Sequence, residues 1–366
     1  MDAILIQRAT GGAKAGALED NVLIRRFQEI RILRTALPMV VVLLVCAGKP
    51  AHASSITIDG SFDSSITSLG DATDIEAAIN SAIGEVVGAI SSPNNITVNI
   101  DFQNMNAGLG ESTTGIYTVS YYDYYNALKA VATSPDQLTA LASLGPAPTS
   151  ETSVNPATGT AQMILTSAEG RNLGFATPGV VAGPGGTYDT IISLNTSITS
   201  PPNSIAGNYG LEAVAIHEID ESLGIGGTGS SLGSSTAAGD LDLYRYSAPG
   251  VRSYSTDPSV TSYFSIDGGV TVLSYFNQVA GADYADWASD PIPAGFGPQV
   301  QDAFGEPGTN PSLGPNELLA FNSIGYNITS ATATPEPSTL LLGGSVLAVI
   351  AAARKRRAGL PKSRQS

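Results

Sequence analysis

An apolar segment near each end of the chain limits the part that can fold as a soluble domain. Near the N-terminus, the basic stretch RRFQEIRILR precedes the apolar run ALPMVVVLLVCA, and the small residues AHASS follow directly. This order is typical of a secretory signal peptide with an A-x-A cleavage site. The run is shorter than the roughly 20 residues of a membrane-spanning helix, which argues against a retained anchor. We therefore predict a signal peptide over residues 1–53, cleaved after Ala53, and an exported protein.

The C-terminal end carries a second ordered set of features. The triplet Pro335-Glu336-Pro337 precedes the apolar run Leu340–Ala353, and the basic residues RKRR follow it. This order resembles the PEP-CTERM sorting signal. The resemblance implies processing by an exosortase, a membrane-embedded enzyme of Gram-negative bacteria that make exopolysaccharide. It also implies sorting to the cell surface, the outer membrane or the extracellular matrix. The short apolar run suits a transient transmembrane anchor whose basic end stays cytoplasmic, and a permanent tail anchor is the alternative.

The chain between these segments is strongly acidic. Residues 54–353 include 28 acidic and four basic residues, a formal charge of −24. This charge excludes a nucleic-acid binder that neutralises phosphates, and it favours divalent cations as partners. The single cysteine, Cys46, lies in the signal peptide, so the exported chain has no disulfide. It must therefore be stabilised by its hydrophobic core, for which its length is ample.

Hydrophobic periodicity predicts alternating strands and helices. A strand at 55–59 is followed by a helix over 74–90, and alternation predicts another strand over 96–102. The further predicted elements are a strand that becomes a helix near Tyr121, a helix from Ser134, strands in 160–170 and 187–195, a helix over 209–223, a hairpin around Gly268-Gly269 and a helix over 315–324. This order predicts one α+β domain over residues 54–330, in which a mixed or antiparallel sheet packs against one long helix.

Histidine usage directs attention to one helix. His52 lies in the predicted cleavage site, so chemistry that needs an imidazole must use His217, in the stretch AVAIHEIDESLGIGG. Residues four apart lie on one helix face, so His217 and Glu221 can bind the same metal ion. Glu218 is rotated by about 100° from His217 and lies beside that ion, where a carboxylate can take a proton from water. The opposite face, with Ile216 and Ile219, suits packing on a sheet.

This helix resembles the active helix of the zincin metallopeptidases, especially the metzincin pattern H-E-x-x-H-x-x-G-x-x-H/D. His217 matches the first ligand, Glu218 the general base and Gly224 the turn glycine. The stretch LLAFNSIGYNI resembles a helix that follows the active site in several secreted bacterial zincins. The form H-E-x-x-E-x-L-G resembles that of PEP-CTERM-bearing bacterial proteins grouped as metalloproteases. The resemblance implies a zincin-like fold over 54–330 and a zinc-dependent endopeptidase.

The chain departs from the metzincin pattern at two ligands. Glu221 replaces the second histidine, Gly227 stands where the third ligand would be, and no methionine follows Met163 to form a Met-turn. The third ligand must therefore come from elsewhere. Asp240 and Asp242 are the predicted candidates, because gluzincins also take a carboxylate from a following segment.

The predicted ligands bear on the identity of the metal. Zn²⁺ accepts nitrogen and oxygen ligands, so one histidine and two carboxylates can bind it. A carboxylate in place of an imidazole lowers the Lewis acidity of the ion and makes Mn²⁺ or Ca²⁺ more acceptable. Tyr244 and Tyr246 are candidates for stabilising an oxyanion.

Other acidic and aromatic residues allow two interpretations each. Asp283, Asp286 and Asp290 surround Trp287 and are candidates either for a Ca²⁺ site or for turn and surface positions. Asp267 is interpreted as a hairpin turn residue. The tyrosines of SYYDYYNAL form either a sugar-binding platform or a helix face packed on the sheet.

Two functions are compatible with these features. The first is a secreted or surface-sorted zinc-dependent endopeptidase, in which Glu218 is the general base toward a metal-activated water. The second is a non-catalytic component of the exopolysaccharide or biofilm matrix, or an adhesion protein, on a zincin-like scaffold. Metal content and proteolysis distinguish them.

Overall fold

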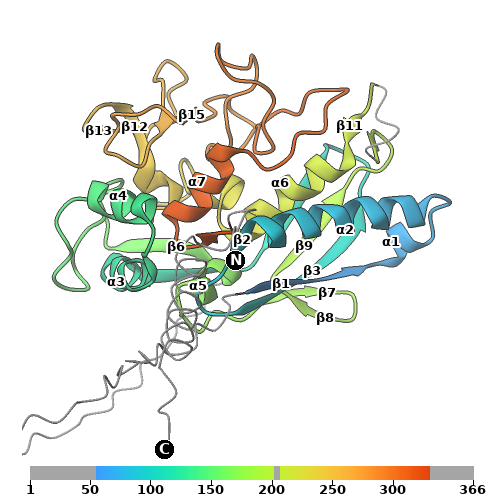
Figure 1. Cartoon of the computed structure of the whole chain (residues 1–366), viewed down its shortest axis with the longest axis horizontal. Coiled ribbons are helices and arrows are strands. Elements are labelled where there is room, and N and C mark those ends of the chain that lie inside the picture. The colour runs from blue at the N-terminus through green and yellow to red at the C-terminus, as the bar shows by residue number, and fades with distance from the viewer. Residues whose placement is uncertain (1–54, 202–206, 330–366) are drawn as a thin grey trace, which may run out of the picture. The chain divides into compact units, whose positions relative to one another are not determined.

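The computed structural model describes residues 55–201 and 207–329, and it confirms a mixed α+β fold (Figure 1). The predicted signal peptide (1–53) and the sorting tail (331–366), with its predicted transmembrane segment, lie outside the described residues. Within the described residues, no helix combines the length and the apolar character needed to cross a bilayer.

A four-stranded sheet in the order β1-β3-β9-β4 forms the centre of the N-terminal half. Its strands are β1 (Ile56–Phe62), β3 (Ile96–Asn104), β9 (Thr190–Leu194) and β4 (Gly110–Thr114). The first three run parallel, whereas β4 pairs antiparallel with β9 and places Gly110 opposite Leu194. Alternate residues of β3 are buried, including Ile96, Val98 and Ile100, as the two-residue period of a strand requires. The sheet is therefore mixed, with its antiparallel strand at one edge.

Two helices lie on the same side of this sheet, as Figure 1 shows. The longer one, α2 (Ala72–Ala89), packs against α6 (Leu211–Leu223), and α6 packs against β4 and β9. The buried residues of α2 recur at helical spacing: Ile75, Ala78, Ile79, Ala82 and Val86. On α6, Ile216 and Ile219 are fully buried, so the apolar face predicted for this helix is confirmed.

The remaining elements are short. The other helices are α1 (Ser64–Thr67), α3 (Tyr121–Val131), α4 (Pro135–Ser143), α5 (Ser167–Asn172) and α7 (Pro315–Ser323), with the 3₁₀ turns η2 (Gly226–Gly229) and η3 (Leu241–Tyr244). The other strands are β2 (Ile90–Ser91), β5 (Ile116–Ser120), β6 (Gln162–Thr166), β7 (Val181–Gly183), β8 (Gly186–Tyr188), β10 (Thr199–Ser200), β11 (Tyr209–Gly210), β12 (Arg245–Ala248), β13 (Val251–Arg252), β14 (Tyr263–Phe264), β15 (Ser274–Tyr275) and β16 (Asn327–Ile328).

Two of the differences between the structure and the predicted elements have a clear local reason. The strand predicted over 160–170 ends at Thr166, because the Thr166 side chain accepts a hydrogen bond from Glu169 N and caps α5. β4 is not among the predicted elements, because its sequence GESTT has no apolar residue and so gives no hydrophobic signal. Elsewhere the hairpin around Gly268-Gly269 is confirmed, since β14 pairs antiparallel with β15. Three tyrosines of the aromatic run are buried in the core: Tyr121, Tyr124 and Tyr125.

The C-terminal half packs around Trp287. This side chain is fully buried, and its ring centroid lies 5.6 Å from that of Phe264 and 5.3 Å from that of Phe276. Its indole Nε1 donates a hydrogen bond of 2.9 Å to Glu317 Oε1, at the start of α7. Trp287 therefore ties an irregular segment to the β12–β15 sheet and to α7.

We predict that Ile219→Ala lowers the free energy of unfolding by about 2–4 kcal/mol, because it leaves a cavity at a fully buried position of α6. Urea unfolding followed by circular dichroism measures this change. The control is Ile116→Ala, the same truncation at a side chain that is 53% exposed, which should cost much less. Equal losses for the two variants would contradict the packing described for α6.

Candidate metal centre

Helix α6 brings His217 and Glu221 to the same place. The helix ends at Gly224, whose φ of 109° lies in the left-handed region that favours glycine. His217 stands about two turns before this end and Glu221 about one turn before it, and His217 Nε2 lies 3.6 Å from Glu221 Oε1. The four-residue spacing in the sequence thus gives the convergence that it predicts.

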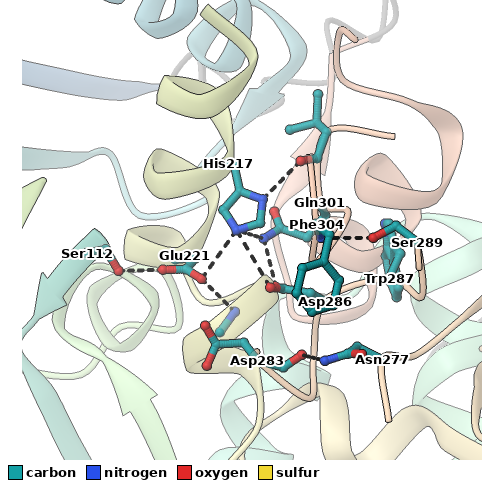
Figure 2. A network of polar contacts seen from close by, with 12 residues as sticks. Ser112, His217, Glu221, Asn277, Asp283, Asp286, Trp287, Ser289, Gln301 and Phe304 are labelled. Carbon is teal, nitrogen blue, oxygen red and sulfur yellow. Dashed lines mark hydrogen bonds and ion pairs between the residues drawn. The ribbon is translucent and has the colours of Figure 1, made fainter. Parts of the chain in front are cut away.

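A third side chain, Asp286, joins them from the segment that follows β15. Asp286 Oδ2 lies 3.7 Å from His217 Nε2, and one donor atom from each of the three residues lies within 4.8 Å of the other two (Figure 2). The Asp286 carbonyl accepts a hydrogen bond from Asn277 N, and the buried Trp287 follows directly in the chain. The rigid packing around Trp287 therefore holds Asp286 against α6.

Arg245 supports the same segment from the side of the β12–β15 sheet. Its guanidinium lies 4.5 Å from the centroid of the Phe276 ring and donates hydrogen bonds to the carbonyls of Tyr284 and Asn277. Asn277 Nδ2 in turn donates to the carbonyl of Asp283. Residues 277–284, which precede Asp286, are thus held by hydrogen bonds to their backbone carbonyls.

Hydrogen bonds orient the side chains of His217 and Glu221. His217 Nδ1 lies 3.0 Å from the Val300 carbonyl, which can only accept, so Nδ1 carries a proton and Nε2 points at the carboxylates. Glu221 Oε2 accepts a hydrogen bond of 2.6 Å from Ser112 Oγ of β4, and Glu221 Oε1 accepts one of 3.1 Å from Gly227 N. This arrangement is typical of metal-binding side chains, whose partners fix ring and carboxylate orientation.

Gly227 occupies the position where the metzincin pattern places its third ligand. A Cβ at this residue would overlap Glu221 Oε1 and lie 3.1 Å from Asp283 Cγ. No side chain fits there, and the backbone N–H of Gly227 binds Glu221 instead. The absence of a ligand at this position therefore has a steric reason, and Asp286 supplies a carboxylate in its place.

Glu218 lies beside the three donor residues, next to the edge strand. A Cβ on Gly110 of β4 would overlap the Glu218 carboxylate, so this glycine makes room for it. His217, Glu218 and Glu221 line a cleft of about 650 Å³ together with residues 108–112 and Asp286. None of the described residues that line the cleft is Lys or Arg.

The charges in this group are out of balance. Burial raises the pKa of Glu218 and of Asp286 well above their ordinary values, and Glu221 raises both further while His217 lowers them. Burial alone would lower the pKa of His217, but the charge of Asp286 and of its other carboxylate neighbours raises it well above 6.5. Burial would raise the pKa of Glu221, but His217, Ser112 and Gly227 hold it below 4.5. The three acids therefore cannot all be ionised beside one imidazole, and a divalent cation would allow them to be.

The three donors fit a metal ion. Two ligands at about 2.1 Å from Zn²⁺ in tetrahedral geometry lie about 3.4 Å apart. The separations of 3.6 and 3.7 Å from His217 Nε2 come close to this value, and the donor atoms of Glu221 and Asp286 lie within 4.8 Å of each other. One imidazole nitrogen and two carboxylate oxygens also agree with the donor types of Zn²⁺, and the oxygen share makes Mn²⁺ or Ca²⁺ acceptable.

The structure places Asp240 and Asp242 away from this group. Asp242 accepts hydrogen bonds from Ser230 Oγ and from the backbone N–H groups of Ser231 and Gly239, so it organises the turn before η3. Asp240 caps η3 through Leu241 N. Neither is among the residues whose donor atoms converge with those of His217. Their role as metal ligands stays a sequence-based prediction, and the geometry favours Asp286.

The two candidate oxyanion donors are also distant from the cleft. Tyr244 is fully buried, and its hydroxyl donates to the Ser323 carbonyl at the end of α7. The Tyr246 ring lies under the guanidinium of Arg252. Neither tyrosine lines the cleft, and both contribute to the packing of β12 and η3.

Asp240 belongs to a second pair of buried acids. Burial raises its pKa to about 7, although hydrogen bonds from Glu169 and Leu241 oppose this change. Burial and the neighbouring charge of Asp240 raise the pKa of Glu169 well above 4.5. The pair lies beneath the end of α6, where a Cβ on Gly224 would lie 2.9 Å from Glu169 Oε2.

Sequence reasoning missed two residues of the site and separated a third from it. Ser112 lies in β4, which has no hydrophobic pattern, and Gln301 has no charge and no motif. The sequence groups Asp286 with Asp283 and Asp290, whereas the structure exposes Asp283 and Asp290 and buries Asp286. The sequence feature that could have singled out Asp286 is the adjacent Trp287, since a tryptophan within an acidic loop indicates that part of the loop is buried.

Comparison with known proteins identifies the C-terminal segment. A family model for the PEP-CTERM protein-sorting motif matches residues 333–357, so the predicted sorting signal is confirmed. This motif implies recognition by an exosortase, export and sorting to the surface. No curated protein and no solved structure matches the chain.

We predict that metal-free protein is more stable at pH 5 than at pH 8. An acid whose pKa is raised on folding contributes stability that is complete below its unfolded pKa of about 4 and is lost as the pH rises through its folded pKa, about 7 for Asp240. The melting temperature in EDTA should therefore fall by at least about 3 °C from pH 5 to pH 8. In Glu169→Gln this fall should be smaller, because an amide hydrogen-bonds to ionised Asp240.

The matched control is Glu111→Gln, at an exposed position of β4, which should keep the wild-type pH dependence. If Glu169→Gln and wild type lose the same number of degrees over this pH range, the buried pair does not hold an extra proton.

Proposed function

We propose that the chain is an exported, surface-sorted, metal-dependent endopeptidase with a zincin-like arrangement of its active helix. The observation that carries the proposal is the convergence of His217, Glu221 and Asp286 at a cleft where Glu218 lies beside them. Zn²⁺ is the expected cofactor, with Mn²⁺ or Ca²⁺ as alternatives that the two carboxylates favour. The confirmed sorting motif supports a place of action outside the cytoplasm.

His217, Glu221 and Asp286 would hold the metal, which when bound acts as a Lewis acid toward a substrate carbonyl and lowers the pKa of water. Glu218 is adjacent in sequence to the first proposed ligand, and it lines the same cleft, next to Gly110 of β4. Its carboxylate accepts the proton of the attacking water and later donates it to the leaving amine. Burial of Glu218 supports this role. It raises the pKa of the carboxyl group toward the neutral range, in which one group can both accept and donate a proton.

The free edge of strand β4 is an observation that favours a peptide substrate. Among the described residues, β4 pairs only with β9, and Gly110, Glu111 and Ser112 line the cleft from its other side. An extended peptide can add to such an edge through main-chain hydrogen bonds. That position would place its backbone along the cleft, in front of Glu218 and the three donors. The geometry therefore suits an internal segment of an unfolded or flexible chain.

The first test measures metal content. Purified wild-type protein should contain about one equivalent of metal after reconstitution with Zn²⁺ or Mn²⁺, measured by elemental analysis. Asp286→Asn and His217→Ala should weaken binding by more than about 100-fold, since even partners of metal ligands contribute about 10–100-fold. Asp290→Asn, an exposed residue of the same segment, serves as the control and should bind normally. Wild-type protein that stays metal-free while folded would refute the proposal.

The second test measures catalysis on casein. Glu218→Gln should lower kcat by about 10²–10⁴-fold while metal content stays unchanged, because the amide cannot accept a proton. Glu212→Gln provides a control on the same helix, at a carboxylate that binds Ser81 and Asn310 instead. A wild-type protein that binds metal but cleaves no peptide would favour the alternative, a matrix or adhesion component on the same scaffold.

A further inference from the structure

A fourth polar side chain, that of Gln301, reaches into the donor group. Gln301 is fully buried, and its Nε2 lies 3.3 Å from His217 Nε2 and 3.1 Å from Asp286 Oδ1 (Figure 2). Its other amide atom, Oε1, is buried and has no hydrogen-bond partner. A buried carbonyl oxygen without a partner is uncommon in folded proteins and asks for an explanation.

The backbone around Gln301 is fixed, so the side chain cannot simply move away. Gln301 O accepts a hydrogen bond of 2.8 Å from Trp287 N, and Gln301 N donates to Glu317 Oε1 at 3.4 Å. The preceding residue, Val300, binds His217 Nδ1 through its carbonyl. One short segment thus orients the histidine and at the same time presents an amide to the place where the donor atoms meet.

The amide as oriented suits the group without a cation, because its NH₂ group lies 3.3 Å from His217 Nε2 and donates to Asp286 Oδ1. A cation between these atoms would repel the NH₂ group and attract a carbonyl oxygen. Rotation of the terminal amide by 180° exchanges Nε2 and Oε1 with almost no change in shape. The same rotation would bring Oε1 of Gln301, which has no hydrogen-bond partner, into contact with the cation.

We propose that Gln301 is a further metal ligand through Oε1, and that its amide turns over when the ion binds. The donor set then consists of one imidazole nitrogen, two carboxylate oxygens and one amide oxygen. Such an oxygen-rich set suits Mn²⁺ and also accommodates Zn²⁺ with more than four ligands when a water or substrate is present. This inference rests on the proposed metal site formed by His217, Glu221 and Asp286.

The test compares three variants of the purified protein with wild type. Isothermal titration calorimetry with Mn²⁺ and, separately, with Zn²⁺ gives the dissociation constants. Gln301→Leu removes the oxygen and should weaken binding by at least about tenfold. Gln301→Glu keeps an oxygen and adds a charge, so it should bind at least as tightly as wild type. Gln299→Leu is the matched control, because Gln299 also lines the cleft but binds Ser274 and Asn316.

The visible spectrum of the Co²⁺-substituted protein provides a readout of coordination. Loss of a ligand in Gln301→Leu should shift the d–d bands, whereas Gln301→Glu and Gln299→Leu should retain them. Fluorescence of Trp287, the single tryptophan of the chain, reports whether each variant keeps the fold around Asp286.

The outcomes separate this inference from the proposed function. If Gln301→Glu weakens binding as much as Gln301→Leu does, the NH₂ group is what matters and the inference fails while the metal site stands. Unchanged affinity together with an unchanged Co²⁺ spectrum in Gln301→Leu would likewise show that Gln301 is not a ligand. If wild-type protein binds none of the ions, the metal site and the role of Gln301 fail together.

Discussion

The burial of several carboxyl groups around one imidazole is the constraint on which the rest of the site depends. Glu218, Glu221 and Asp286 are each at least nine-tenths buried, and His217 is the basic group among them. Buried charges need partners, and burial alone pushes such groups toward their neutral forms. A divalent cation resolves this imbalance better than proton sharing does, because it neutralises more than one carboxylate at once. The burial and the charges of these groups therefore agree with the proposed metal centre.

Two well-packed parts of the fold bring these buried groups together. Helix α6 supplies two donors from one face, and its other face is anchored by Ile216 and Ile219. The segment from Asn277 to Trp287 supplies the third, and it is held by aromatic packing and by Arg245 rather than by regular secondary structure. In an exported chain without disulfides, this packing is what keeps an irregular segment in register with a helix. Trp287, the only tryptophan of the chain, stands next to Asp286 and provides much of this packing.

The sequence-based predictions succeeded where periodicity or spacing carries the information. The class of fold, the helices α2 and α6 and the strands β1, β3 and β9 follow from patterns of apolar residues. The sorting motif follows from an ordered set of parts, and its match confirms it. Strand β4 was not predicted from the sequence, because its residues GESTT show no alternation of apolar and polar side chains. Helix α5 was not predicted either, because the only sequence feature that marks its start is the capping residue Thr166, which follows an apolar run.

The sequence alone determined that His217 and Glu221 share a helix face, because helical spacing is a local property that nearby residues fix. It also determined that any third ligand must come from a distant segment, since Gly227 carries no side chain. Only the tertiary structure decided which distant carboxylate lies beside His217 and Glu221. Asp240, Asp242, Asp283 and Asp286 are chemically alike, and the choice among them depends on how Trp287 packs and which backbone groups Arg245 binds. Those contacts join residues far apart in the chain, so no local pattern records them.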